Sequence, residues 1–161
     1  MPFSPGGASG RRALFFITIL ATAIALGGAL AHLFEMPRKL MLSREDYFTV
    51  QQIYAGWDLF GLVLVIQFCT LVLLAWRSFR EYYVFRPVLA ALLLMLASQV
   101  IFWLFTFPAN AATQNWTQMP VNWEMLRRQW EYSHAMGAFC QLLGLSSLIW
   151  ALFARVRAAG R

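Results

Sequence analysis

The chain alternates between four long apolar runs and the polar segments that separate them. A helix that crosses the hydrocarbon core of a bilayer needs about 20 mostly apolar residues, at a rise of about 1.5 Å per residue. Each run is long enough to cross, since they occupy residues 13–34, 57–76, 88–107 and 133–153. The pattern therefore predicts an all-α fold, an integral membrane four-helix bundle with two long loops at one end.

The overall composition agrees with a membrane protein. Of the 161 residues, 60% are hydrophobic and only 12% are charged, which lies outside the usual range of soluble globular proteins. We expect a single transmembrane domain over residues 13–153. A flexible cytoplasmic leader at residues 1–12 is expected before it, and a basic cytoplasmic tail at residues 154–161 after it.

The basic residues are distributed unevenly between the two sides of the predicted bundle. Eight of the thirteen Lys and Arg residues lie in the leader, the second connector and the tail, where Glu81 is the single acid. Cytoplasmic segments of membrane proteins are enriched in Lys and Arg. Both termini are therefore expected in the cytoplasm and both long loops outside, in a multi-pass protein of the cell inner membrane. The net charge is +6, but the Lys and Arg residues lie beside helix ends rather than on one basic face. The expected partner is therefore the lipid bilayer and not nucleic acid.

The two histidines of the chain fall at the outer ends of the first and last runs. Each has an acid three residues away, so His32 and Glu35 share one helix face, and Glu131 and His134 share another. The second pair matches the Glu-x-x-His pattern of di-iron carboxylate bundles. Together with Asp58 at the start of the second run, these residues are candidate ligands for a metal ion such as iron or copper.

Other interpretations compete with a metal site. The histidines can instead bond loop carbonyl groups, while the two acids form ion pairs in water with basic residues of the same loops. The basic residues in reach are Arg38, Arg127 and Arg128. A haem held by both histidines would sit at the membrane edge rather than inside the bundle, which disfavours it.

Aromatic residues crowd the two outer loops. They are Tyr47, Tyr54, Trp57, Trp116, Trp123, Trp130 and Tyr132. Trp and Tyr at this depth are typical of the aromatic belts at the two membrane surfaces. A functional alternative is that the loops fold over the mouth of the bundle as a lid for a flat apolar ligand, such as a quinone or another aromatic compound.

Two further signals concern the bundle interior and the first loop. Gln67, Gln99 and Gln141 lie within apolar runs, and lipid offers an amide no hydrogen bond, so all three are expected inside the bundle. There they can join helices or line a pocket. In the first loop, Ser43 with Asp46 three residues later resembles a capping box and predicts a short helix at the interface.

The segment Pro120-Val-Asn122, followed by Trp130-x-x-x-His134 at the opening of the last helix, resembles the anthrone-oxygenase-like family of small four-helix membrane proteins. The resemblance covers mainly the third loop and the last helix. It implies oxidation of an anthrone to an anthraquinone by molecular oxygen, without a dedicated cofactor. Under this resemblance His134 is the candidate catalytic base, and Asn122 and Trp130 belong to the pocket.

Two functions of different classes follow from these signals. The first is an oxygenase-like redox enzyme with an outward-facing polar and aromatic site, acting on an aromatic or quinoid small molecule. The second is a non-enzymatic accessory or assembly subunit whose outer loops bind a larger membrane complex or a second copy of the chain. A transporter is disfavoured, because the sequence shows no internal repeat and no interrupted helix.

Overall fold

The computed structural model describes residues 5–159, and within that part of the chain every regular element is a helix. The long helices are α1 (Pro5–Lys39), α3 (Gly61–Ser78), α4 (Tyr82–Ile101) and α6 (Trp123–Ala159). The shorter elements are α2 (Arg44–Gln51), η1 (Gln52–Tyr54), η2 (Trp57–Phe60), η3 (Phe102–Thr106) and α5 (Phe107–Ala112). The all-helical fold expected from the four apolar runs is confirmed.

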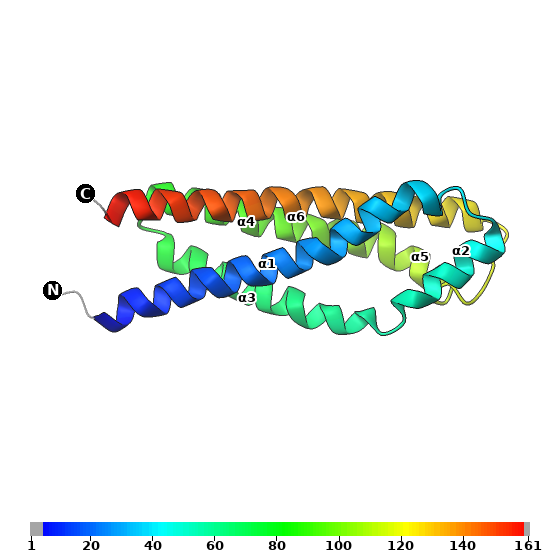
Figure 1. The fold of residues 1–161 in the computed structure, drawn as a ribbon, viewed down its shortest axis with the longest axis horizontal. Coiled ribbons are helices and arrows are strands. Elements are labelled where there is room, and N and C mark those ends of the chain that lie inside the picture. Colours follow the sequence, from blue (N-terminus) through cyan, green and yellow to red (C-terminus); the bar gives the residue numbers. More distant parts are fainter. Residues whose placement is uncertain (1–4, 160–161) are drawn as a thin grey trace.

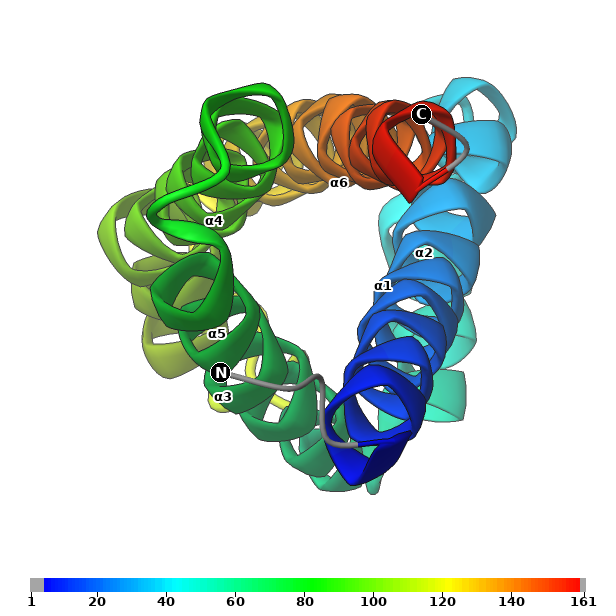
Figure 2. The ribbon, with the colours of Figure 1, turned by 90° about the vertical axis from the view of Figure 1, so that its left-hand side faces the viewer.

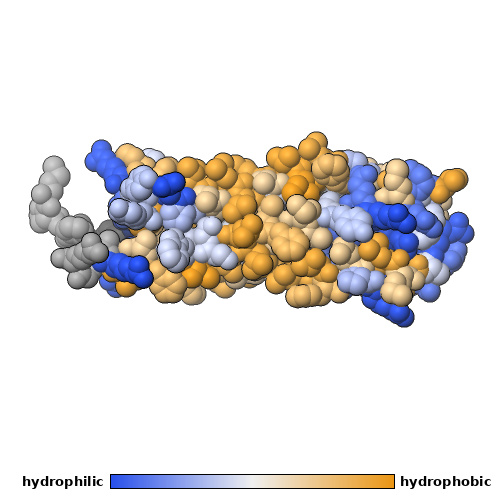
Figure 3. All heavy atoms as spheres, turned by 90° about the horizontal axis from the view of Figure 1, so that it is seen from above, coloured by the Kyte–Doolittle hydropathy of each residue, from blue (hydrophilic) through white to orange (hydrophobic). Residues whose placement is uncertain are grey.

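Four stretches of helix are long and apolar enough to cross a membrane. They are Ser9–Lys39, Trp57–Ser78, Tyr82–Ala112 and Trp123–Arg157. An apolar band covers the middle of the molecule, and hydrophilic residues gather at its two ends (Figure 3). The start of α1 and the end of α6 lie at one end, whereas α2 and α5 lie at the other, which we call the loop end (Figure 1).

Helix boundaries differ from the prediction in four places. Helix α1 already begins at Pro5, so residues 5–12 are helical rather than a flexible leader, and residues 1–4 lie outside the described part. Helix α6 begins at Trp123, seven residues before the predicted opening at Trp130, because the second half of the third loop continues the helix. It also includes the predicted tail as far as Ala159, while residues 160–161 are not described.

The fourth difference is at Pro108, which directly follows the apolar run at residues 88–107 and would ordinarily end a helix there. The chain instead passes through one π-helical turn, η3, and continues as α5. Pro108 lies just after this turn, where it has no N–H to donate to a carbonyl group of the preceding turn. A π turn immediately before the proline accommodates the altered hydrogen-bond pattern. The helix therefore reaches beyond the apolar run and places Ala109 against the loop end.

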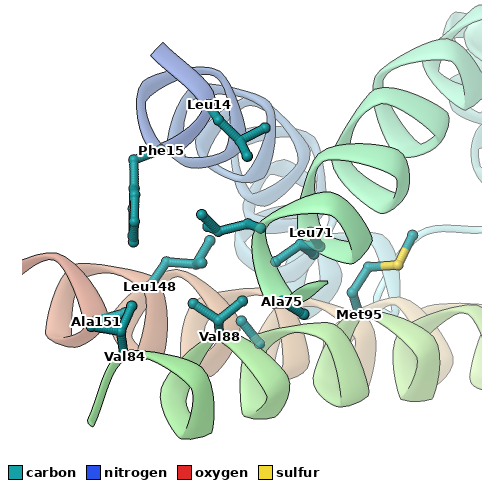
Figure 4. Close-up of a cluster of buried hydrophobic side chains, with 11 residues drawn as sticks. Leu14, Phe15, Leu71, Ala75, Val84, Val88, Met95, Leu148 and Ala151 are labelled. Atoms are coloured by element: carbon teal, nitrogen blue, oxygen red, sulfur yellow. The ribbon is translucent and has the colours of Figure 1, made fainter. Parts of the chain in front are cut away.

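The four long helices form a ring in which α1 neighbours α3 and α6, and α4 neighbours the same two helices (Figure 2). At the end that holds the termini, their interior is mainly apolar, with Thr18 and Ser78 as buried polar residues. Phe15 of α1, Leu71 of α3, Val88 of α4 and Leu148 of α6 meet in one buried cluster (Figure 4). This cluster packs the four helices together at that end.

A layer of amides crosses the middle of the bundle. The Gln67 Nε2 atom donates to Gln141 Oε1 over 2.8 Å and to Thr22 Oγ1 over 3.3 Å, and Gln141 Nε2 donates to Ser98 Oγ over 3.4 Å. These hydrogen bonds join all four long helices, and polar residues often connect transmembrane helices in this way. Gln99, also expected inside, is only half-buried. The two buried amides are satisfied, so this layer is a structural element.

Candidate functional site

The loop end of the bundle brings the two histidines into contact. His32, in the last two turns of α1, and His134, in α6, have ring centroids 4.3 Å apart. The Trp130 ring lies one helical turn before His134, with centroids 3.9 Å from that imidazole and 5.0 Å from His32. We call the group of His32, Lys39, Trp130, Glu131 and His134 the histidine site.

A buried ion pair lies beside the imidazoles. The Lys39 Nζ atom is 2.9 Å from Glu131 Oε1, and the two side chains are only 4% and 0% exposed. The Tyr47 hydroxyl donates to the same carboxylate oxygen over 2.9 Å, and Gln51 Nε2 donates to that hydroxyl over 3.0 Å. Lys39 Nζ also lies 4.3 Å from the Trp130 ring centroid, which permits a cation–π contact. The site therefore contains one fully desolvated pair of charges.

The proposed pairing of the outer acids with arginines in water was wrong. Glu131 is buried and pairs with Lys39, while Glu35 accepts a hydrogen bond from the Tyr54 hydroxyl. Arg127 instead donates to the Leu42 carbonyl oxygen over 3.0 Å. The sequence gave no sign that Lys39 and Tyr54 would replace the arginines as partners of the two acids, because this depends on how the first loop folds back across α6.

A lid of aromatic side chains covers the histidine site. Tyr47 and Phe48 of α2, Trp116 of the third loop and Trp130 of α6 are buried in one cluster. Trp116 lies edge-on to Tyr47, with ring centroids 5.1 Å apart, and its carbonyl oxygen accepts a hydrogen bond from Gln52 Nε2. The aromatic-belt interpretation is therefore wrong for the buried members of the set, although Trp57 and Tyr132 are exposed.

Helix α2 holds its half of the lid in place. Ser43 caps the helix, since its hydroxyl accepts a hydrogen bond from the Asp46 backbone N–H over 3.1 Å, which confirms the predicted cap. Burial and the neighbouring Glu131 carboxylate raise the pKa of Tyr47. Burial likewise raises the pKa of Tyr54, with the hydrogen bond to Glu35 adding to the effect. Both tyrosines therefore remain protonated and act as hydrogen-bond donors at neutral pH.

The third loop reaches the lid through a left-handed turn. Gln114, Asn115 and Trp116 have φ values of 47°, 55° and 64°, a conformation that costs non-glycine residues about 1–2 kcal/mol each. Hydrogen bonds hold the turn, among them Asn115 N–H to the Asn110 carbonyl over 2.7 Å and Trp116 Nε1 to Asn110 Oδ1 over 3.1 Å. Strained backbone of this kind persists where its surroundings enforce it, here to place the Trp116 ring over the site.

Replacing Gln114 by glycine is expected to raise the free energy of unfolding by about 1 kcal/mol, because glycine adopts positive φ without steric cost. The Gln114 side chain is exposed and the backbone hydrogen bonds of the turn are kept. Gln118→Gly is the matched control, since Gln118 is exposed too but has no positive φ. Gln118→Gly should lower the free energy of unfolding, because glycine loses more conformational freedom on folding than glutamine. Thermal unfolding in mild detergent separates the two, and equal losses in both would show that the turn is unstrained.

Buried polar atoms without a hydrogen-bond partner gather at the same end. Six such side-chain atoms occur among the described residues, and five of them lie at the loop end. They are His32 Nδ1, Gln51 Oε1, Arg127 Nε, Trp130 Nε1 and Glu131 Oε2. Native proteins satisfy nearly all buried polar groups with protein atoms or water. A cluster of unsatisfied donors and acceptors therefore indicates that a ligand or ordered water completes this site.

The predicted metal ligands do not come together as one set. His32 and His134 are in contact. Glu131 instead forms an ion pair with Lys39, and Glu35 accepts a hydrogen bond from Tyr54. Asp58 is exposed in η2. Across residues 5–159, no group of three or more His, Cys, Asp or Glu side chains is placed to hold a metal ion. What the structure assembles instead is a pair of imidazoles beside an indole and an ion pair.

The three candidate catalytic residues have different positions. His134 and Trp130 are adjacent in the histidine site, and the His134 Nδ1 atom lies 3.0 Å from the Trp130 carbonyl oxygen. Asn122 is exposed just before α6. Twelve residues of helix separate it from His134, which corresponds to about 18 Å. Lys39 and Gln51, by contrast, were not identified from the sequence, and Tyr47 was named only as one of the aromatic loop residues. The predicted short helix after Ser43 does place Tyr47 and Gln51 on one helical face.

Comparison of the chain with protein-family models, with curated proteins and with solved structures finds no match.

Proposed function

We propose that the chain is a multi-pass inner-membrane enzyme, with cytoplasmic termini, that oxidises a flat aromatic or quinoid molecule at the histidine site. The observation that supports this most is the meeting of His32, His134 and Trp130, with buried donors and acceptors left for a ligand. An apolar substrate dissolved in the bilayer can approach this level, because the site lies at the end of the apolar band. The aromatic lid suits a planar ring system.

In this proposal His134 is the base. Its Nδ1 atom faces the Trp130 carbonyl oxygen, which is an acceptor, so the ring proton resides on Nδ1 and Nε2 keeps its lone pair. The Trp130 indole provides a stacking surface and a free N–H donor. The Lys39 ammonium group, over the same ring, provides positive charge near an oxygen anion of the substrate. Asn122 has no role here, because it lies too far along α6.

The reaction has a simple balance. His134 takes a proton from the acidic methylene carbon of an anthrone-like substrate, and the electron pair of that C–H bond remains on the carbanion. Dioxygen oxidises this carbon and becomes bound to it as a peroxide anion, which takes the proton back from His134 and becomes a hydroperoxide. Loss of water from the hydroperoxide forms the carbonyl group of the quinone. One oxygen atom stays in the product, the other leaves as water with both hydrogens of the methylene group, and dioxygen is the oxidant.

Oxygen uptake by the purified protein tests this proposal. In mild detergent, the wild type is expected to consume one O2 for each anthrone converted to anthraquinone, well above the rate without protein, whereas the His32→Ala/His134→Ala variant should not. Circular dichroism checks that the variant is folded. The absence of uptake by folded wild type would contradict the proposal. Iron or copper at one ion per chain, lost in the double variant, would replace the cofactor-free scheme by a metal-dependent one.

An accessory or assembly role is the second candidate, supported by a different observation. Met119, Val121 and Met125 are exposed at the loop end, where the third loop enters α6. Apolar side chains outside the band that lipid covers are typical of surfaces that bind another protein. This role predicts that a membrane partner copurifies with the wild type and is lost when Val121 is replaced by aspartate, with no oxygen uptake in either protein.

A further inference from the structure

A groove of about 560 Å³ runs along the outside of the bundle between α4 and α6, far from the histidine site. Arg86 and Trp150 line it near the end that holds the termini, and Ala90, Leu94 and Leu143 line it toward the membrane centre. Leu94 is two helical turns past Arg86, so the groove extends roughly 12 Å from its charged part to its apolar part. These are the dimensions and polarity of a lipid headgroup joined to the start of its acyl chain.

Among the described residues that line the groove, Arg86 is the one with a charged side chain. It is exposed and takes part in none of the ion pairs formed by the described residues. One guanidinium nitrogen donates to the Tyr82 hydroxyl over 2.7 Å, which holds the side chain along α4 and leaves other N–H groups of the fork available. A guanidinium group in this state is suited to bind a phosphate group through two parallel hydrogen bonds.

The charge of this end favours an anionic occupant. Seven arginines of the described chain lie here: Arg11, Arg12, Arg77, Arg80, Arg86, Arg155 and Arg157. Glu81 is the one acid among them, and it is already paired with Arg11. Each basic residue near the membrane surface attracts anionic lipid. A second copy of the chain, inserted in the same orientation, would bring two such arginine-rich ends together and is therefore disfavoured as the occupant.

We infer that the groove between α4 and α6 is a binding site for an anionic phospholipid. The phosphate group lies on the Arg86 guanidinium, the Trp150 indole lies at the headgroup level, and an acyl chain follows Ala90, Leu94 and Leu143. The hydroxyl groups of Ser146 and Ser147 donate to carbonyl oxygens of their own helix over 2.9 Å each, so their oxygens can still accept a hydrogen bond from a glycerol headgroup. The site is independent of the proposed oxidation.

Native mass spectrometry with an equimolar mixture of phosphatidylglycerol and phosphatidylcholine of identical acyl chains tests the inference. The wild type is expected to retain one phosphatidylglycerol in preference to phosphatidylcholine. Arg86→Gln should weaken that retention at least about tenfold, because it removes the direct hydrogen bonds from the guanidinium group to the phosphate as well as the charge. Arg80→Gln is the matched control, because it removes the same charge at the same end from a residue outside the groove, and it should change retention less than twofold.

A second variant separates the groove from the charge. Ala90→Trp fills the apolar part and keeps every arginine, so it should also reduce the retained phosphatidylglycerol. Equal losses in Arg86→Gln and Arg80→Gln would overturn the inference, since general attraction by the arginine-rich end would then explain binding. Equal retention of the two lipids by the wild type would overturn it as well. So would a dimer that forms in the wild type and disappears in Ala90→Trp.

Discussion

Replacing Lys39 by methionine is expected to lower the free energy of unfolding by about 3–5 kcal/mol, the usual result of removing one partner of a buried ion pair. Methionine fills a similar apolar volume, so the effect reports charge rather than packing. In the variant the Glu131 carboxylate keeps its hydrogen bond from the Tyr47 hydroxyl but loses Lys39, the one cation that contacts it among residues 5–159. Unfolding followed by circular dichroism in mixed micelles measures the change.

Two further variants isolate the cause. Arg44→Met removes a cation from the ion pair with Glu45, whose side chains are both exposed, and should change stability little because water screens that pair. Lys39→Met combined with Glu131→Leu removes both buried charges and should recover much of the lost stability. If Lys39→Met costs no more than Arg44→Met, the carboxylate is not held as a buried charge, and the account of the site given above is wrong.

The fold could be predicted from the sequence because the bilayer imposes strong rules. A membrane-spanning segment must satisfy its own backbone hydrogen bonds over about 20 apolar residues, so hydropathy alone locates four helices. Hydropathy does not locate where they end. Residues 123–132 are polar and aromatic, yet they continue α6, because packing against α2 and α5 outside the apolar band decides that question.

The site could be predicted only in part, for the same physical reason. His32 and His134 carried a signal, since each lies at the end of a long apolar run next to one of the two long loops. Lys39 carried none: among thirteen basic residues it looked like one more charge beside a helix end. Its burial depends on α2 folding back over the bundle and on the left-handed turn that brings in Trp116, and neither follows from local patterns.

Replacing His134 by alanine is expected to lower the turnover of an anthrone substrate by about 10²–10⁴-fold, the usual contribution of a positioned base. The loss should appear in kcat rather than in KM, because the Trp130 stacking surface remains. Trp130→Phe is the matched comparison: it keeps a ring and removes the free N–H, so it should raise KM more than it lowers kcat.

Added imidazole distinguishes a missing base from a damaged structure. Alanine at position 134 leaves a space beside the His32 and Trp130 rings, which lie 4.3 Å and 3.9 Å from the native imidazole, and free imidazole of the same shape can occupy it. Turnover should then rise with imidazole concentration in His134→Ala and remain unchanged in the wild type. A folded His134→Ala variant with full turnover would show that another residue transfers the proton. His32 contacts the same space, so His32→Ala with added imidazole would then test that residue as the base.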